Sequence, residues 1–196
     1  MSKAEKTKQF IIEKTAPIFN RKGFAGTSLN DITGATGLTK GSIYGNFENK
    51  DEVALAAFDY NYGQMAAVIK RKMESKTHPI DKLKVYLTIY SEFTKIPALH
   101  GGCPILNTAI EADDTHSALR SKAVGAIEGW YKTIETIIKR GQDTGQIKNG
   151  PNGREFAGAF IALIEGGLML TKVTGKMDGI KAALKQAEKM IKDITP

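Results

Sequence analysis

The chain has 196 residues and one cysteine, and it is long enough to bury a substantial core without disulfides or structural metals. The lone Cys103 excludes an intramolecular disulfide and a zinc site built from several cysteines, and it fits a reducing compartment. The formal net charge is +7, and residues 1–50 hold eight Lys or Arg against four Asp or Glu, so any polyanionic partner is expected at that end.

Neither a leader nor a membrane span is expected. Residues 1–14 alternate charged with apolar residues and lack the apolar core of a signal peptide. The longest nearly apolar run, 156–170, contains Glu165 and three glycines, and it is too short to cross a bilayer. We therefore expect a cytoplasmic protein in which this run forms a buried helix.

Apolar residues recur every three or four positions along almost the whole chain, which predicts an all-α fold of about nine helices. Phe10 and Leu170 are expected on buried helix faces. Caps and breakers, such as Ser28, Gly37 and Pro104, divide the chain. The expected helices cover approximately residues 3–22, 28–35, 39–45, 50–77, 83–93, 105–112, 116–144, 156–170 and 180–194.

The short, basic helices stand at the N-terminal end, and the longer ones follow. This division predicts a small domain, 1–48, and a larger one, 49–196, with a helix from about 50 to 75 linking the two.

The segment 27–52 predicts a helix-turn-helix. Ser28 and Thr39 are N-cap residues, and Gly37 supplies the turn between the two helices. The second helix of such a motif can enter the major groove of DNA, although many helical corners share the pattern. This helix and the start of the next one carry five hydrogen-bond donors and one glycine that would allow close approach. These residues are Thr39, Lys40, Gly41, Ser42, Tyr44 and Lys50. Each has an alternative reading as a cap, a packing residue or a solvated charge.

The run Gly37-Leu38-Thr39-Lys40-Gly41-Ser42-Ile43-Tyr44, followed by Asn46-Phe47 and Asn49-Lys50, resembles the N-terminal domain of TetR/AcrR-family transcriptional regulators. The resemblance implies a three-helix helix-turn-helix DNA-binding domain, a long fourth helix, and a C-terminal helical domain for ligand binding and dimerisation. It implies that Ser28, Tyr44 and Lys50 contact phosphates. It also implies that Thr39, Lys40, Gly41 and Ser42 approach the groove. Gly45 departs from the family, which often has Tyr or His there.

Small residues at four-residue spacing, Gly158, Ala162 and Gly166, predict close packing of a helix. Together with Leu184 and Ile191 they could form a four-helix interface between two subunits, and a corner within one chain is the alternative. A homodimer also suits a helix-turn-helix, because a two-fold dimer reads the two halves of a palindromic operator.

A small-molecule effector would need an apolar pocket with a few polar groups. The candidates lie on inward faces of the fifth to eighth helices: Tyr90, Phe93, Cys103, Asn107, Glu111, Trp130, Phe160 and Glu165. The aromatic residues could equally be core, and the two carboxylates could pair with an internal Lys or Arg.

Cys103 begins a helix, where the helix dipole favours a thiolate. Its setting is similar to that of a TetR subgroup in which some members sense oxidants or electrophiles. A small buried hydrophobe is the alternative.

Together with these patterns, the resemblance implies a DNA-binding transcriptional regulator, a dimeric repressor released from its operator by a small-molecule effector. The alternatives are a redox-responsive repressor that uses Cys103 and a helical adaptor that does not bind DNA. The histidines show no metal-ligand spacing, and no phosphate-binding loop or nucleophile elbow is present. No enzyme activity, catalytic residue, metal or cofactor is therefore expected.

Overall fold

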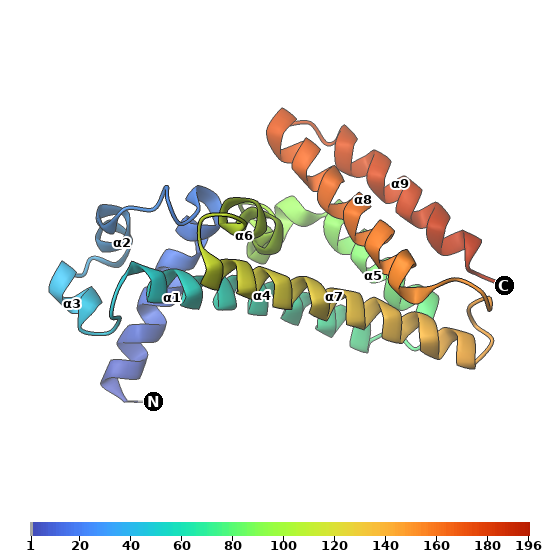
Figure 1. Cartoon of the computed structure of the whole chain (residues 1–196), viewed down its shortest axis with the longest axis horizontal. Coiled ribbons are helices and arrows are strands. Elements are labelled where there is room, and N and C mark those ends of the chain that lie inside the picture. Colours follow the sequence, from blue (N-terminus) through green and yellow to red (C-terminus); the bar gives the residue numbers. More distant parts are fainter. Residues whose placement is uncertain (1) are drawn as a thin grey trace. The chain divides into compact units, whose positions relative to one another are not determined.

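The computed structural model describes residues 2–196, and this part of the chain folds into nine α-helices and two short 3₁₀ turns, without strands (Figure 1). This confirms the all-α prediction. The helices are α1 Lys3–Lys22, α2 Leu29–Thr36, α3 Lys40–Tyr44, α4 Lys50–Glu74, α5 Pro79–Ser91, α6 Pro104–Ala112, α7 Ser117–Asp143, α8 Gly153–Thr174 and α9 Asp178–Asp193. The 3₁₀ turns, Phe93–Lys95 and Pro97–Leu99, lie between α5 and α6.

The chain forms two compact units. The first contains residues 2–65 and 98–126, and the second contains residues 66–97 and 127–196. Helices α4 and α7 each begin in the first unit and end in the second. The first unit is larger than the predicted domain 1–48, because α6 packs on α1 and is joined to it by hydrogen bonds.

Local capping explains several helix ends. The Ser28 side chain accepts a hydrogen bond from the Asp31 N–H at the start of α2. The Asn152 side chain accepts from two backbone N–H groups, so α8 begins three residues before the predicted Phe156. Gly37 and Gly175 end their helices in the left-handed conformation that glycine adopts without strain.

Helix α5 ends earlier than predicted. The Glu92 N–H bonds to the Ile89 carbonyl three residues back, which tightens the chain into the 3₁₀ turn that contains Phe93. Pro97 would end a helix near Ile96 in any case, because proline disfavours helical backbone at the residue before it.

Helix α1 contributes Ile11, Ala16 and Phe19 to the core of the first unit, and one prediction for this helix is wrong. Ile11 and Ala16 have no exposed surface. Phe10, predicted inward, is 37% exposed, and the Lys14 ammonium lies 5.7 Å from its ring centre. The neighbouring Ile11 takes the inward position instead.

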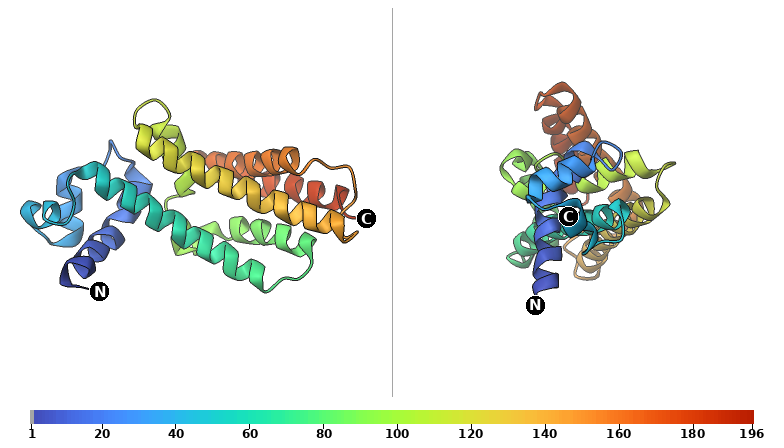
Figure 2. Two further views of the ribbon diagram at one scale, coloured as in Figure 1. Left: turned by 60° about the horizontal axis from the view of Figure 1, so that its bottom comes forward. Right: turned by 90° about the vertical axis from the view of Figure 1, so that its left-hand side faces the viewer.

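In the second unit, α8 and α9 lie side by side and run in opposite directions (Figure 2). Their close contact is made by glycines: a Cβ added to Gly167 would lie 2.5 Å from the Ala183 Cβ, and one added to Gly179 would lie 2.6 Å from the Leu170 Cβ. Leu170 stands at the edge of this contact and is 49% exposed, so its predicted burial is also wrong.

Helix α8 has 22 residues, more than the run predicted for it. It is long and apolar enough to span a bilayer, so the prediction that this run is too short to cross one is wrong. Of its most apolar part, 44% is buried within the chain, and core helices of globular domains can be as long and as apolar.

Candidate nucleic-acid interface

The turn between α2 and α3 is held by side-chain hydroxyls. The Thr36 hydroxyl donates to the Ile32 carbonyl at 2.8 Å and accepts from the Leu38 N–H at 3.2 Å. Gly37 has a φ of 67°, where other residues would be strained. The Thr39 hydroxyl then accepts from the Ser42 N–H at 3.2 Å and caps α3. These bonds define the geometry of a helix-turn-helix.

Helix α3 turns its apolar side inward and its polar residues outward. Ile43 has no exposed surface, whereas Thr39, Lys40 and Gly41 are exposed. No described atom lies within 4 Å of a Cβ added to Gly41, so packing within the chain does not require glycine there. Ser42 and Tyr44 are half-buried. The exposed N-terminal half of α3 is therefore accessible to a macromolecular partner.

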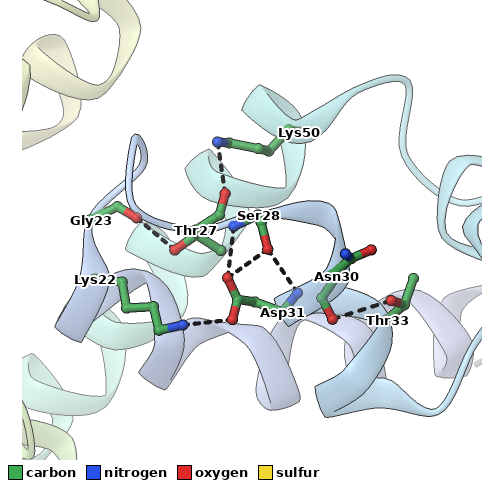
Figure 3. A network of polar contacts seen from close by, with 8 residues as sticks. All are labelled: Lys22, Gly23, Thr27, Ser28, Asn30, Asp31, Thr33 and Lys50. Atoms are coloured by element: carbon green, nitrogen blue, oxygen red, sulfur yellow. Dashed lines mark hydrogen bonds and ion pairs between the residues drawn. The ribbon is translucent and has the colours of Figure 1, made fainter.

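Lys50 and Ser28 also have contacts within the chain. The Lys50 ammonium donates to the Thr27 carbonyl at 2.8 Å (Figure 3). It also lies 4.2 Å from the centre of the Phe24 ring. The Ser28 hydroxyl donates to an Asp31 carboxylate oxygen at 2.8 Å and accepts from the Asp31 N–H at 3.1 Å. Both residues thus help to hold the backbone around the start of α2. The phosphate contacts predicted for them would be a second role for each.

Two ion pairs connect α1 to the following helices. The Lys22 ammonium lies 2.6 Å from the Asp31 carboxylate, and the Lys8 ammonium lies 2.6 Å from the Glu52 carboxylate. Hydrogen bonds from Lys22 and then from Ser28 hold the pKa of Asp31 well below its usual range. A hydrogen bond from Lys8, followed by one from the Glu48 N–H, lowers the pKa of Glu52. The carboxylates of Asp31 and Glu52 are therefore both ionised at neutral pH.

The predicted effector residues fall into two groups. In the second unit, the Tyr90 and Trp130 rings stack with centres 5.9 Å apart, and Tyr86 packs against both Trp130 and Phe160. The Trp130 indole nitrogen is buried and has no hydrogen-bond acceptor among residues 2–196. Phe93 and Glu165 also belong to this unit, the former 9% exposed and the latter half-buried.

Asn107, Glu111 and Cys103 belong to the first unit. The Asn107 amide donates to the Asn20 carbonyl at 2.9 Å, and the Glu111 carboxylate accepts from the backbone of the turn after α1. Cys103 has no exposed surface. A cavity lined by Asn107 and Glu111 has a volume of about 20 Å³, room for about one water, whereas effectors need roughly 300 Å³ or more.

A wider hollow of about 580 Å³ is open to solvent between α5 and α9. Lysines, hydroxyls and carboxylates line it, among them Lys84, Thr88 and Lys185. The residues predicted to bind the effector lie elsewhere in the chain.

The predicted dimer residues do not form one surface. A Cβ added to Gly158 would lie 2.9 Å from the Tyr131 hydroxyl, so Gly158 faces α7 of its own chain. Leu184 and Ile191 are buried within the chain. Ala162 and Gly166 face outward, and the exposed Met169, Leu170 and Val173 continue their side of α8.

Sequence and structure comparisons agree on the family. Residues 11–57 match the model of bacterial regulatory proteins of the tetR family, and residues 79–187 match the Tetracyclin repressor-like C-terminal domain. The HTH-type transcriptional repressor DhaR of Mycobacterium sp. (strain GP1) is 27% identical over 168 residues, 85% of this chain and 82% of DhaR.

An HTH-type transcriptional regulator of Lactococcus lactis subsp. lactis, from the lacX 3' region, is 31% identical over 90% of this chain and 88% of its own. The crystal structure of a TetR-family regulator from Cytophaga hutchinsonii is 46% identical, covers 100% of this chain and 98% of its own, and superposes with a TM-score of 0.95. The chain therefore belongs to the TetR family, as a DNA-binding transcriptional regulator with a C-terminal ligand-binding domain.

Proposed function

We propose that this regulator binds a palindromic operator as a homodimer and is released from it by a small-molecule effector. The observation that carries the proposal is the exposed N-terminal half of α3, where Thr39, Lys40 and Gly41 stand outward on a helix anchored by the buried Ile43. Donors at the start of such a helix can reach phosphates and base edges in the major groove.

Dimer formation is supported by the apolar strip on α8. Leu170 is 49% exposed and Val173 is 79% exposed, next to Ala162 and Gly166. A strip of this kind would be covered if a second copy packed on it, and an isologous two-fold contact would present two reading helices to adjacent grooves.

Effector binding is supported by the aromatic cluster of the second unit. The buried indole N–H of Trp130 has no acceptor among the described residues, and the Tyr90 ring stacks on the indole. A flat apolar effector that carries a hydrogen-bond acceptor would satisfy this group. The effector must prefer the conformation that binds DNA poorly, since only differential affinity shifts the equilibrium.

The regulator acts by binding, and we infer that it needs no catalytic residue and works in the cytoplasm, as suits a soluble family whose target is DNA. Sensing through Cys103 is not part of the proposal, because an oxidant would have to reach a thiol with no exposed surface.

The test is a selection of double-stranded DNA from a random-sequence library by the purified chain, followed by affinity measurements at several salt concentrations. The proposal expects a palindromic consensus and an affinity that falls steeply with salt, as counterion release requires. Lys40→Ala should relax the preference at one or two consensus positions, by about 1–3 kcal/mol if Lys40 reaches a base. Enrichment of no duplex, or binding that is indifferent to salt, would refute the proposal.

A further inference from the structure

The carboxylate of Glu111, on α6, binds the turn that follows α1. Its two oxygens accept hydrogen bonds from consecutive backbone N–H groups, those of Phe24 at 2.7 Å and Ala25 at 2.8 Å. Consecutive N–H groups of a turn form a concave site for an anion. Hydrogen bonds to an ionised acceptor are about twice as strong as neutral ones. One side chain thus joins two segments that lie 87 positions apart in the sequence.

The turn is shaped to receive this carboxylate. Gly23 has a φ of 74°, which glycine adopts without strain. A Cβ added at Gly23 would lie 2.3 Å from a carboxylate oxygen of Glu111, well inside van der Waals contact. Gly23 therefore has two reasons to be glycine, the backbone conformation and the space that Glu111 occupies.

The same turn leads directly into the helix-turn-helix. The Thr27 hydroxyl donates to the Gly23 carbonyl at 2.6 Å, and the Thr27 carbonyl accepts from Lys50 at 2.8 Å (Figure 3). Ser28, the next residue, caps α2. The position of residues 23–27 therefore determines where α2 begins and where the Lys50 ammonium lies.

We propose that Glu111 is a positioning residue for DNA binding: by holding residues 23–27, it fixes α2 and α3 in the orientation that the operator requires. Without it, these helices would sample several orientations. The apparent affinity would then fall in proportion to the fraction of molecules that remain competent to bind. The inference rests on the proposed operator function, and it replaces the predicted effector contact of Glu111, whose carboxylate is already occupied.

The experiment compares Glu111→Gln with Asp114→Asn, which removes the same charge from an exposed position just after α6. Glutamine keeps one acceptor but turns an NH₂ donor toward the other N–H group. The probes are the duplex selected from the random library and an unrelated duplex of equal length. Glu111→Gln should bind the selected duplex at least about fivefold more weakly than Asp114→Asn does, at the lower end of usual coupling between sites. The two variants should bind the unrelated duplex equally, since that affinity follows net charge.

Hydrogen exchange gives a readout that does not depend on DNA. The amides of Phe24 and Ala25 should exchange faster in Glu111→Gln than in the wild type and the control. Glu111→Asp, which keeps the charge but is one methylene shorter, serves as a second variant and should show a smaller loss.

Several results would contradict the positioning role of Glu111. Equal affinities of Glu111→Gln and Asp114→Asn for the selected duplex, or unchanged exchange at Phe24 and Ala25, would remove the positioning role. Loss of affinity for both duplexes alike would also remove it. Failure of the wild type to select any duplex would refute the operator function itself, which is a distinguishable outcome.

Discussion

Lys22, at the end of α1, and Asp31, in the first turn of α2, form an ion pair in which the ammonium nitrogen lies 2.6 Å from a carboxylate oxygen (Figure 3). Asp31 also accepts from the Ser28 N–H at 2.8 Å and completes the capping box of α2. One carboxylate therefore both starts α2 and ties it to α1.

Asp31→Asn should lower the thermal stability of the chain at neutral pH and make that stability less sensitive to acid. The pKa of Asp31 is lowered in the folded state, first by the hydrogen bond from Lys22 and then by Ser28. Its contribution is thus fully present above the unfolded-state pKa of about 3.9 and is lost as the pH falls toward the folded value. Melting temperatures measured from pH 7 to pH 3 should show the difference between wild type and variant shrinking below about pH 4. A difference that stays constant over this range would contradict the assignment, and Asp114→Asn is the control.

Lys50→Ala should weaken binding to all DNA sequences. If the ammonium contacts a phosphate, its loss should reduce the slope of log K against log salt by about one for each half-site. The Thr27 carbonyl would also lose its donor, which costs on the order of 1 kcal/mol of stability. Fluorescence anisotropy at four salt concentrations measures the slope. Lys76→Ala, at an exposed position beyond the end of α4, should leave the slope unchanged, and an unchanged slope in Lys50→Ala would exclude the phosphate contact.

Adjacent glycines of α8 should respond to alanine in opposite directions. Gly167→Ala forces a methyl group against Ala183 and the Ile180 backbone, and overpacking of this kind costs about 1–3 kcal/mol. In the monomer, Gly166→Ala meets no described atom within 4 Å and should gain about 0.5–1 kcal/mol, because alanine favours helix. For a chain of this size each kcal/mol shifts the melting temperature by about 2–4 °C.

Both glycine variants should be melted at a chain concentration low enough to keep the chain monomeric, because Gly166 lies on the strip proposed for the dimer and dimerisation makes the melting temperature depend on concentration. If the Gly167→Ala variant is as stable as Gly166→Ala, then Gly167 does not pack closely against Ala183 of α9.

Leu170→Glu should dissociate the proposed dimer without unfolding the chain. Leu170 is 49% exposed, so a charge is tolerated in the monomer, but it would be desolvated twice in a two-fold interface. Sedimentation equilibrium should show a dimer dissociation constant at least about tenfold higher than that of the wild type. Val124→Glu places the same charge on the 52% exposed Val124 of α7 and is the control. If Leu170→Glu remains as dimeric as the control, the interface lies elsewhere.

The helix-turn-helix could be predicted from the sequence because its signals are local. Ser28, Gly37 and Thr39 each act within three or four residues of themselves, as a cap or as a turn. Periodicity likewise predicted nine helices, since each helix buries one face. Periodicity was wrong about Phe10 because two adjacent apolar residues, Phe10 and Ile11, could each have taken the inward position, and Ile11 occupies it.

Small-residue spacing predicted close helix packing on α8 but not the partner. Gly158 meets Tyr131 of α7, Gly166 faces outward, and the α8–α9 contact uses Gly167, which stood outside the predicted strip. A glycine indicates that something approaches closely, whereas the identity of the neighbour depends on how distant segments fold together.

The sequence by itself determined the helices, their caps and the donor-bearing α3, because these depend on residues within one or two helical turns. Only the tertiary structure decided what Glu111 does. From the sequence, Glu111 was one of two carboxylates on apolar helix faces that could bind an effector or pair with a cation. In the folded chain it accepts hydrogen bonds from two backbone N–H groups, which lie 86 and 87 positions away in the sequence. A carboxylate that is partly withdrawn from water, as the half-buried Glu111 is, needs hydrogen-bond donors, and the chain's long-range packing determines which donors it finds.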